Sequence, residues 1–164
     1  MTYDLSSYKL AQNNSVMTHS NFNGLWEEVY GDSQAGLVEI YENYCLYDGS
    51  EQAEHMGIKL ATKPNKANRA TLSANEWNAN VDNLQNILTE FIDHSSNVTS
   101  SKVNTWVANL LPNRQKGNQI TVTQWNKMVD DLQSMLNTLQ ADIDEKEAIY
   151  NAWKFGDQMP IILS

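Results

Sequence analysis

The sequence predicts an all-α protein built from three tandem helical units of about 48 residues each. The prolines Pro64, Pro112 and Pro160 are spaced 48 residues apart, and Trp77 and Trp125 are separated by the same interval. Self-similarity at a fixed period is the usual sign of a repeat architecture. We therefore divide this single domain into an N-terminal arm, three units and an apolar tail: 1–16, 17–64, 65–112, 113–160 and 161–164.

Each unit begins with a helix-start motif: an apolar residue, Ser or Thr, two variable residues, a polar residue, an aromatic residue and Asn. In the third copy, Thr121 can cap the helix by accepting a hydrogen bond from an unpaired backbone N–H, and Gln124 can complete a capping box. Ile120 and Trp125 have the spacing of a hydrophobic staple. The motif residues are Thr18, Phe22, Ser73, Glu76, Trp77, Asn78, Thr121, Gln124, Trp125 and Asn126.

An asparagine follows the aromatic residue in all three copies, as Asn23, Asn78 and Asn126. Capping does not require Asn at this position. We expect its side chain to hydrogen-bond the backbone of an incoming loop, in the same way in each unit. The aromatic residues, including Trp77 and Trp125, should point into the core next to the entering chain.

The N-terminal arm interleaves apolar and polar residues, and we expect it to be extended. It could dock on its own body or on a neighbouring subunit. In the first unit, apolar residues over 22–30 have helical spacing, and Gly31 ends that helix. A second helix should follow, with Ser33 as its cap and a shared apolar face over 37–44. A short helix is expected over 51–60.

The second unit predicts a helix from Trp77 to Phe91 and another that starts at Ser100 or Ser101. The third unit has the strongest pattern, because its apolar residues alternate by four and three from Trp125 to Ile143, and the seam resumes at Tyr150 and Trp153. No helix breaker lies between Gln140 and Tyr150. We expect one long C-terminal helix of roughly 30 residues, with a bent pair near Asp142 as the alternative.

The formal net charge of −9 argues against binding of nucleic acid or of an anionic membrane by bulk charge. Basic residues nevertheless gather around two loops, which leaves a local contact with an acidic partner surface open. Cys45 is the only cysteine, so no internal disulfide forms. We expect no signal peptide and no transmembrane segment, since no apolar run approaches the roughly 18 residues needed to span a bilayer.

Candidate catalytic and metal sites are weak. His19, His55 and His94 would have to converge from three units to bind zinc, so we interpret them as surface or capping residues. Residues 48–54 resemble a calcium loop only faintly and predict a plain turn. The acidic run over 142–147 is typical of a solvated helix face. We therefore expect a protein that is not an enzyme and has no cofactor or metal.

The helix starts over 120–129, Ile-Thr-x-x-x-Trp-Asn-x-Met-Val, and 72–78, Leu-Ser-x-x-x-Trp-Asn, resemble a short segment of tailed-bacteriophage virion proteins. It occurs in their tail-fibre, head-fibre and baseplate-associated chains. The resemblance covers about ten residues per unit, and the first unit departs from it with Phe22 in place of Trp. It implies a structural component of a virion, such as a fibre, collar or adaptor protein.

The sequence thus favours a structural subunit that acts by helix packing and by docking of its terminal segments. Its expected partners are other virion or assembly proteins, and further copies in a homo-oligomer, with no nucleic acid and no membrane. The alternative is a small module that recognises a glycan or protein through exposed aromatics, namely Trp106, Trp153 and the group Tyr41, Tyr44 and Tyr47. The residues expected to pack on partners are Val129, Leu132, Leu136, Leu139, Ile143, Tyr150, Trp153, Ile161, Ile162 and Leu163.

Overall fold

The structure, a computed structural model, describes residues 2–11, 17–50 and 63–158. Over these ranges the protein is all-α and contains no strand beyond an isolated bridge between Asp32 and Ala35. The elements in chain order are the 3-10 turn η1 (Ser6–Tyr8) and the helices α1 (His19–Tyr30), α2 (Gly36–Asp48), α4 (Ala74–Ile92), α5 (Ser100–Ala108) and α6 (Val122–Gln158).

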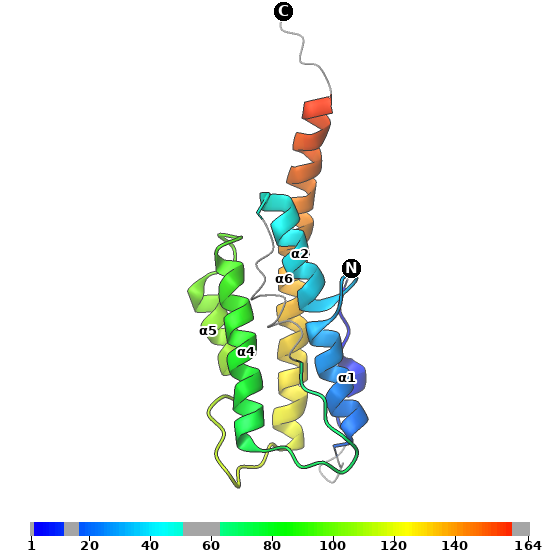
Figure 1. Ribbon diagram of the computed structural model, residues 1–164, viewed down its shortest axis with the longest axis vertical. Helices are drawn as coiled ribbons and strands as arrows, with labels where there is room; N and C mark the ends of the chain where they lie inside the picture. The colour runs from blue at the N-terminus through cyan, green and yellow to red at the C-terminus, as the bar shows by residue number, and fades with distance from the viewer. Residues whose placement is uncertain (1, 12–16, 51–62, 159–164) are drawn as a thin grey trace, which may run out of the picture.

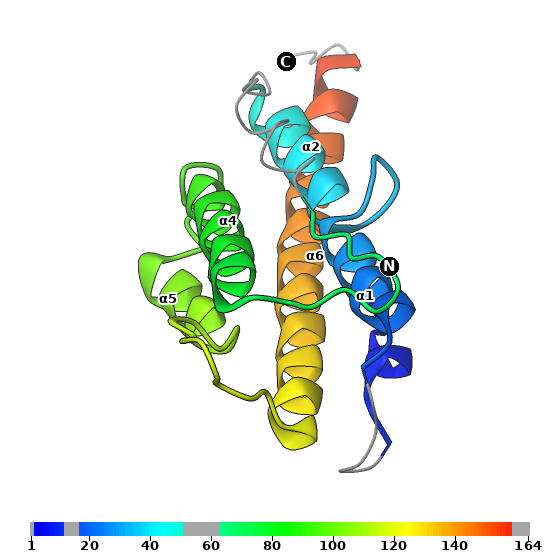
Figure 2. The ribbon, with the colours of Figure 1, turned by 60° about the horizontal axis from the view of Figure 1, so that its bottom comes forward.

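Helices α1, α4 and α6 begin at the same end of the molecule and run in the same direction (Figures 1 and 2). We call this end the base. Helix α2 continues upward from α1, whereas α5 leads from the top of α4 back toward the base. Helix α6 lies in the middle and contacts both α2 and α5, so it forms the axis of the bundle.

All three predicted helix starts are formed at the base. The hydroxyl of Thr18 accepts a hydrogen bond from the backbone N–H of Asn21 at 3.0 Å. Ser73 and Glu76 form a full capping box at the start of α4. Thr121 and Gln124 form the same pair of reciprocal hydrogen bonds, of 3.1 and 2.9 Å, at the start of α6. These caps satisfy backbone donors that no intrahelical acceptor can reach.

The aromatic residues of the three helix starts meet inside the bundle, as predicted. Phe22, Trp77 and Trp125 are each no more than 5% exposed. Phe22 stacks on Trp125 with 6.4 Å between ring centroids, while Trp26 contacts both Phe22 and Trp77 edge to face. The indole N–H groups of Trp77 and Trp125 donate to backbone carbonyls of Leu111 and Tyr8, respectively. A buried indole therefore also fastens a passing loop.

The predicted asparagine hydrogen bonds are confirmed, and each is double. The side-chain oxygen accepts from the backbone N–H of one loop residue, and the side-chain nitrogen donates to the C=O of the same residue. We call this arrangement an asparagine clasp. The clasps join Asn23 to Lys66, Asn78 to Arg114, and Asn126 to Leu10, with distances of 2.7–2.8 Å.

The three clasps follow each other in a ring. Asn23 on α1 holds the connection that leads into α4, and Asn78 on α4 holds the connection that leads into α6. Asn126 on α6 holds the N-terminal arm, which leads into α1. Each parallel helix therefore fixes the chain that enters the next, and the arm closes the ring.

The N-terminal arm docks on its own body, which was one of its two expected sites. It runs along α6 in the opposite direction. Asn137 bonds both the N–H and the C=O of Tyr3, Gln133 accepts from the N–H of Leu5, and Lys9 pairs with Asp130 at 2.6 Å. The side chain of Leu5 is fully buried, so the arm completes the core.

The turn between α1 and α2 differs from the prediction. Ala35, and not Ser33, precedes α2, and it makes no side-chain cap. Gly31 and Gly36 both have positive φ, and a Cβ on Gly36 would lie 2.7 Å from the Cα of Gly31. The backbones of Asp32 and Ala35 exchange two hydrogen bonds, so Ser33 lies inside this turn, and its hydroxyl donates to Glu42 instead of capping α2. The helix expected over 51–60 lies outside the described residues.

Helix α6 is one continuous helix of 37 residues, somewhat longer than the predicted 30. The bent pair near Asp142 does not occur. At 1.5 Å per residue the helix is about 55 Å long. Helix α5 begins at Ser100, as expected, with Thr99 as its cap.

We predict that Asn126→Ala lowers the free energy of unfolding by about 1–3 kcal/mol, because it leaves the backbone N–H and C=O of Leu10 without partners. Asn78→Ala should act similarly through Arg114. The control is Asn86→Ala, an exposed residue of α4. Denaturant unfolding followed by tryptophan fluorescence gives the three values, and equal stabilities for all variants would contradict the role of the clasp.

Candidate functional site

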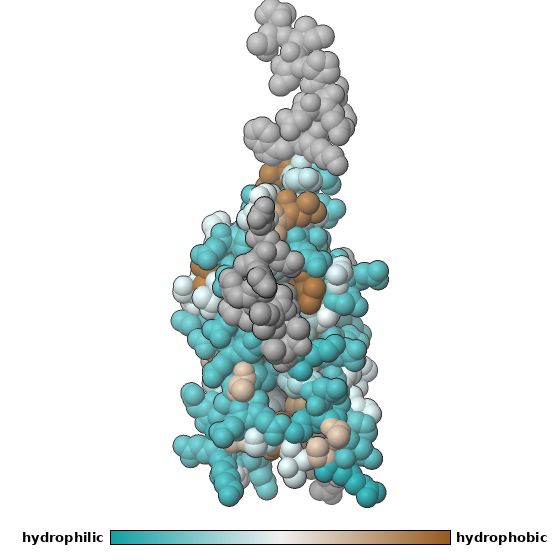
Figure 3. Space-filling view, viewed as in Figure 1, coloured by the Kyte–Doolittle hydropathy of each residue, from teal (hydrophilic) through white to brown (hydrophobic). Residues whose placement is uncertain are grey.

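The first candidate site is the distal end of α6, whose last turns extend beyond α2 and α4 (Figure 1). Near the end of α2, Tyr47 contacts Tyr150 of α6 with 5.3 Å between ring centroids. We call Tyr47, Ile149 and Tyr150, which line one hollow together, the tip surface. Leu46 and Ile149 are 53% and 54% exposed, and this hollow of about 340 Å³ lies beside Ile149. Hydrophobic side chains are visible at this end of the molecule in Figure 3.

The tip surface is bordered by acidic residues. Asp144, Glu145 and Glu147 are exposed on α6 next to it. Burial, followed by the charges of Glu147 and Asp144, raises the pKa of Tyr47. The tip is therefore apolar at its centre and negative at its edge, a combination found at polar-rimmed contact surfaces.

The second candidate site is at the base, where a hollow of about 720 Å³ lies among the starts of α1, α4 and α6. A neighbouring hollow of about 590 Å³ shares part of its wall and extends to Arg114 and Lys116. We call these two hollows the basal cup. The apolar residues that line the larger hollow are Leu10, Met17, Phe22, Leu72, Trp77, Ile120, Val122 and Trp125. Leu72 is common to both hollows and is 40% exposed.

Five residues that we expected to pack on partner helices are buried within this chain. They are Val129, Leu132, Leu136, Leu139 and Ile143, each at most 1% exposed. Their assignment to a partner surface was wrong. The spacing of an apolar seam shows that a helix packs on other helices, but it is the same for neighbours within one chain and in another.

The remaining predicted contact residues lie toward the end of α6 and beyond it. Tyr150 is half-buried and belongs to the tip surface. The side chain of Trp153 and the segment with Ile161, Ile162 and Leu163 lie outside the described residues. Their role stays a prediction.

The aromatic group expected for glycan binding is not assembled at the surface. Tyr41 and Tyr44 are 2% and 0% exposed, and Trp106 is half-buried against the core. Tyr47 is also half-buried, within the tip surface. These side chains point into the bundle because α2 presents its aromatic face to α6 and to the end of α4.

The prediction that the acidic run over 142–147 is a solvated helix face is wrong for Asp142. Its side chain is buried, with 7% of the residue exposed. Tyr44 and Ser95 each donate to its Oδ2 at 2.6 Å, and Asn97 donates to its Oδ1 at 2.7 Å. Burial acts to raise the pKa of Asp142, but these three hydrogen bonds, with the charge of Lys146, outweigh it and hold the pKa below its usual value. This buried carboxylate therefore ties α2 and the α4–α5 turn to α6.

His94 is not a plain surface histidine. Its ring packs edge to face on Tyr41, with 5.5 Å between centroids, and its Nδ1 pairs with the carboxylate of Asp48. Burial acts to raise the pKa of Asp48, but the hydrogen bonds from Ser50 and His94 outweigh burial and lower this pKa below its usual value. Asp48 is the only one of the acids in the suspected calcium loop that the structure describes. His19 lies near Ser20 at the start of α1, and His55 is outside the described residues.

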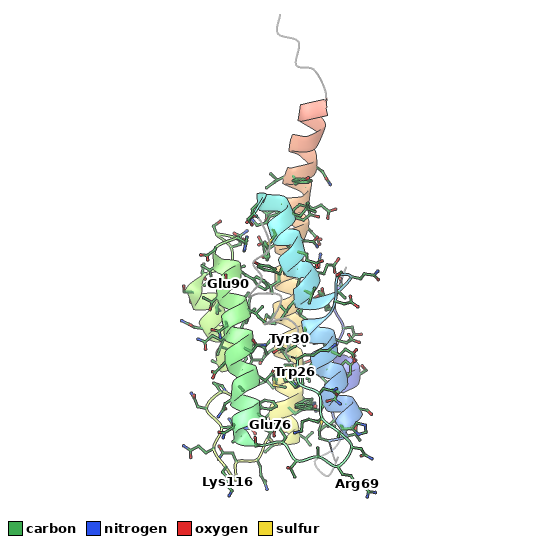
Figure 4. The ribbon with its side chains drawn as sticks, viewed as in Figure 1. Trp26, Tyr30, Arg69, Glu76, Glu90 and Lys116 are labelled. Atoms are coloured by element: carbon green, nitrogen blue, oxygen red, sulfur yellow. The ribbon has the colours of Figure 1, made fainter. Side chains whose placement is uncertain are left out.

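The sequence did not reveal a second buried polar contact, at Tyr30. Its hydroxyl donates to Asn80 at 2.7 Å and accepts from Asn83 at 2.9 Å. Burial raises the pKa of Tyr30 to about 12, so the hydroxyl stays protonated at neutral pH. Figure 4 shows Tyr30 and Trp26 pointing into the space between α1 and α4. The available signal was the position of Asn80, three residues after Trp77 and so on the same face of the helix.

In the part of the chain that the structure describes, no group of three or more His, Cys, Asp or Glu side chains could hold a metal ion. None of the described helices is both long and apolar enough to cross a bilayer. No protein-family model, curated protein or solved structure matches this chain.

We predict that Asp142→Asn lowers the free energy of unfolding at pH 7 by about 1–3 kcal/mol, because an amide nitrogen cannot accept the hydrogen bonds that reach the carboxylate. The folded-state pKa of Asp142 is below the unfolded value of about 3.9. Its contribution is therefore complete above that value and is lost as the pH falls through the folded pKa.

The difference in the free energy of unfolding between wild type and Asp142→Asn should thus be constant near neutral pH and shrink below about pH 4. Urea unfolding at a series of pH values measures it. Glu145→Gln, an exposed change of the same kind on the same helix, is the control and should differ little from wild type. A gap that widens in acid would contradict the assignment.

Proposed function

We propose that this protein is a non-enzymatic structural subunit of a macromolecular assembly, and that the tip of α6 is its contact with other subunits. The observation that carries the proposal is the division of α6 into two parts. From Trp125 to Ile143 its apolar seam is buried in its own chain. Beyond this stretch Ile149 is 54% exposed, on a helix that leaves the bundle.

The energetics of the tip support an intermolecular role. Full burial of a side chain such as Leu or Ile contributes about 1.5–3 kcal/mol. Leu46 and Ile149 are two of the three exposed large hydrophobic residues among those that the structure describes. A partner that covers Ile149 together with the Tyr47–Tyr150 pair would remove this apolar surface from water, which favours association.

The proposal extends to a tailed-bacteriophage virion, as a fibre, collar or adaptor component. Its support is the resemblance of the helix starts over 72–78 and 120–129 to segments of such proteins. In this chain the Trp and Asn of the motif fix loops and fill the core. The resemblance therefore concerns the way in which the helical body is built.

The division into three tandem units of about 48 residues belongs to the same proposal. Its support is the ring of clasps, with one Asn from each of α1, α4 and α6. The units are not equal, since the first contributes α1 and α2, the second α4 and α5, and the third α6 alone. The third unit has no second helix, and the N-terminal arm packs on α6 in its place.

The test is self-association of the purified chain, measured by light scattering over a range of concentrations. We expect oligomers, and we expect Ile149→Glu to raise the concentration needed for assembly by roughly tenfold or more, because a charge would have to be buried. Ala141→Glu adds the same charge at an exposed site on the body of α6 and should have no effect. A wild-type chain that stays monomeric would count against the proposal.

The virion assignment is tested separately. Mass spectrometry of purified particles from the source should detect this chain in a fixed ratio to the other structural proteins. Its absence from the particles would overturn that part of the proposal and leave the subunit role intact.

A further inference from the structure

The basal cup combines an apolar interior with a basic rim. The connections over 65–73 and 109–121, which frame it, contain four Lys or Arg residues and no Asp or Glu, and one of the four, Lys66, pairs with Glu76 of α4. Arg114 and Lys116 line the cup itself, and Arg69 and Lys116 are seen at the base in Figure 4. In a chain with a net charge of −9, this end is locally positive. Its occupant should therefore be apolar and accompanied by negative charge.

The opposite end of the same chain has this chemistry. The sequence after α6 contains Pro160-Ile161-Ile162-Leu163, and residues 144–158 carry four acidic residues against two lysines. Asp157 is only four residues from Ile161. An apolar segment that follows Asp157 closely would bring hydrophobic side chains to the cup and one carboxylate to its rim.

The length of α6 prevents the segment from reaching the cup of its own chain. Val122 starts the helix at the base, and Gln158 lies about 55 Å away along it. Leu163 is five residues beyond Gln158. Even a fully extended chain of five residues spans at most roughly 18 Å. The segment can therefore enter only the cup of another copy.

We propose that the basal cup receives the segment Pro160–Leu163 of a second copy, so that copies join head to tail. This inference rests on the proposed role as an assembly subunit and names the partner and the surface that it uses. A contact between two different surfaces of the same protein does not close on itself unless its rotation forms a ring. Repetition along the axis of α6 would produce a linear filament.

The Leu72 side chain is the central element of the receiving surface. It lies on the walls of both hollows and is exposed enough to be covered by a partner. Its position just before the cap of α4 also allows substitution without loss of the capping box, which uses Ser73 and Glu76. Leu72→Glu should therefore block the cup while the bundle stays folded.

The experiment uses two full-length variants, Leu72→Glu for the cup and Ile161→Glu/Ile162→Glu for the segment. Analytical ultracentrifugation should show that each variant alone needs a concentration roughly 10- to 100-fold higher than wild type to associate, the equivalent of losing one buried aliphatic side chain. A 1:1 mixture should associate at concentrations at which neither variant alone does, because the intact segment of one variant fits the intact cup of the other. Equal melting temperatures establish that both variants are folded.

The charged rim gives a second readout. Lys116→Glu should weaken wild-type association several-fold, and added salt should weaken it further, since exposed charge pairs are screened. Lys102→Glu, on α5 and away from the cup, is the matched control and should leave association unchanged.

The outcomes separate this inference from the proposed function. Association that is lost in Ile149→Glu but retained in Leu72→Glu would overturn the head-to-tail contact and leave the tip as the subunit interface. A mixture of the two variants that stays monomeric would also overturn it. So would a cup that binds only an added acidic peptide or nucleic acid while Leu72→Glu assembles like wild type.

Discussion

The asparagine clasp is the interaction on which the rest of this structure depends. A loop residue that crosses the base brings a backbone N–H and a C=O that both need partners. The amide of Asn offers one acceptor and one donor side by side, as another peptide group would. Because the three clasps come from three parallel helices, they fix the loops, the helix starts and the aromatic junction together. Loss of one clasp would release a connection that the next helix needs for its start.

Helix α6 divides the protein into a closed part and an open part. The arm and α5 pack on its lower part, α2 packs higher, against Asp142 and Tyr150, and the seam from Trp125 to Ile143 is covered by these elements. Its upper part extends beyond the ends of α2 and α4, so apolar side chains such as Ile149 remain exposed. The buried carboxylate of Asp142 lies close to the boundary, where its three hydrogen bonds hold α2 and the α4–α5 turn on the helix. The residues of α6 that stabilise the bundle and those that remain open to a partner thus lie in different parts of the same helix.

Much of the local structure could be predicted, because it depends on residues close in sequence. The caps at Thr18, Ser73 and Thr121 need only a side chain and a backbone three residues away. The double hydrogen bond of Asn126 was expected in kind, but its partner, Leu10, lies 116 residues away and could not be identified. The Asp142 contacts were missed because a carboxylate in an acidic run looks solvated until donors from other elements surround it.

The sequence by itself indicated the long apolar helices, the capped starts of α1, α4 and α6, and the hydrogen-bonding role of the Asn that follows each aromatic residue, since periodicity and capping are local properties. The tertiary structure alone decided which chain covers the seam from Val129 to Ile143, because an apolar stripe carries no information about whether its partner is its own chain or another. It also decided where the arm docks and that the three helix starts enclose a cup. These features depend on the relative direction of helices that are far apart in sequence, which only their packing fixes.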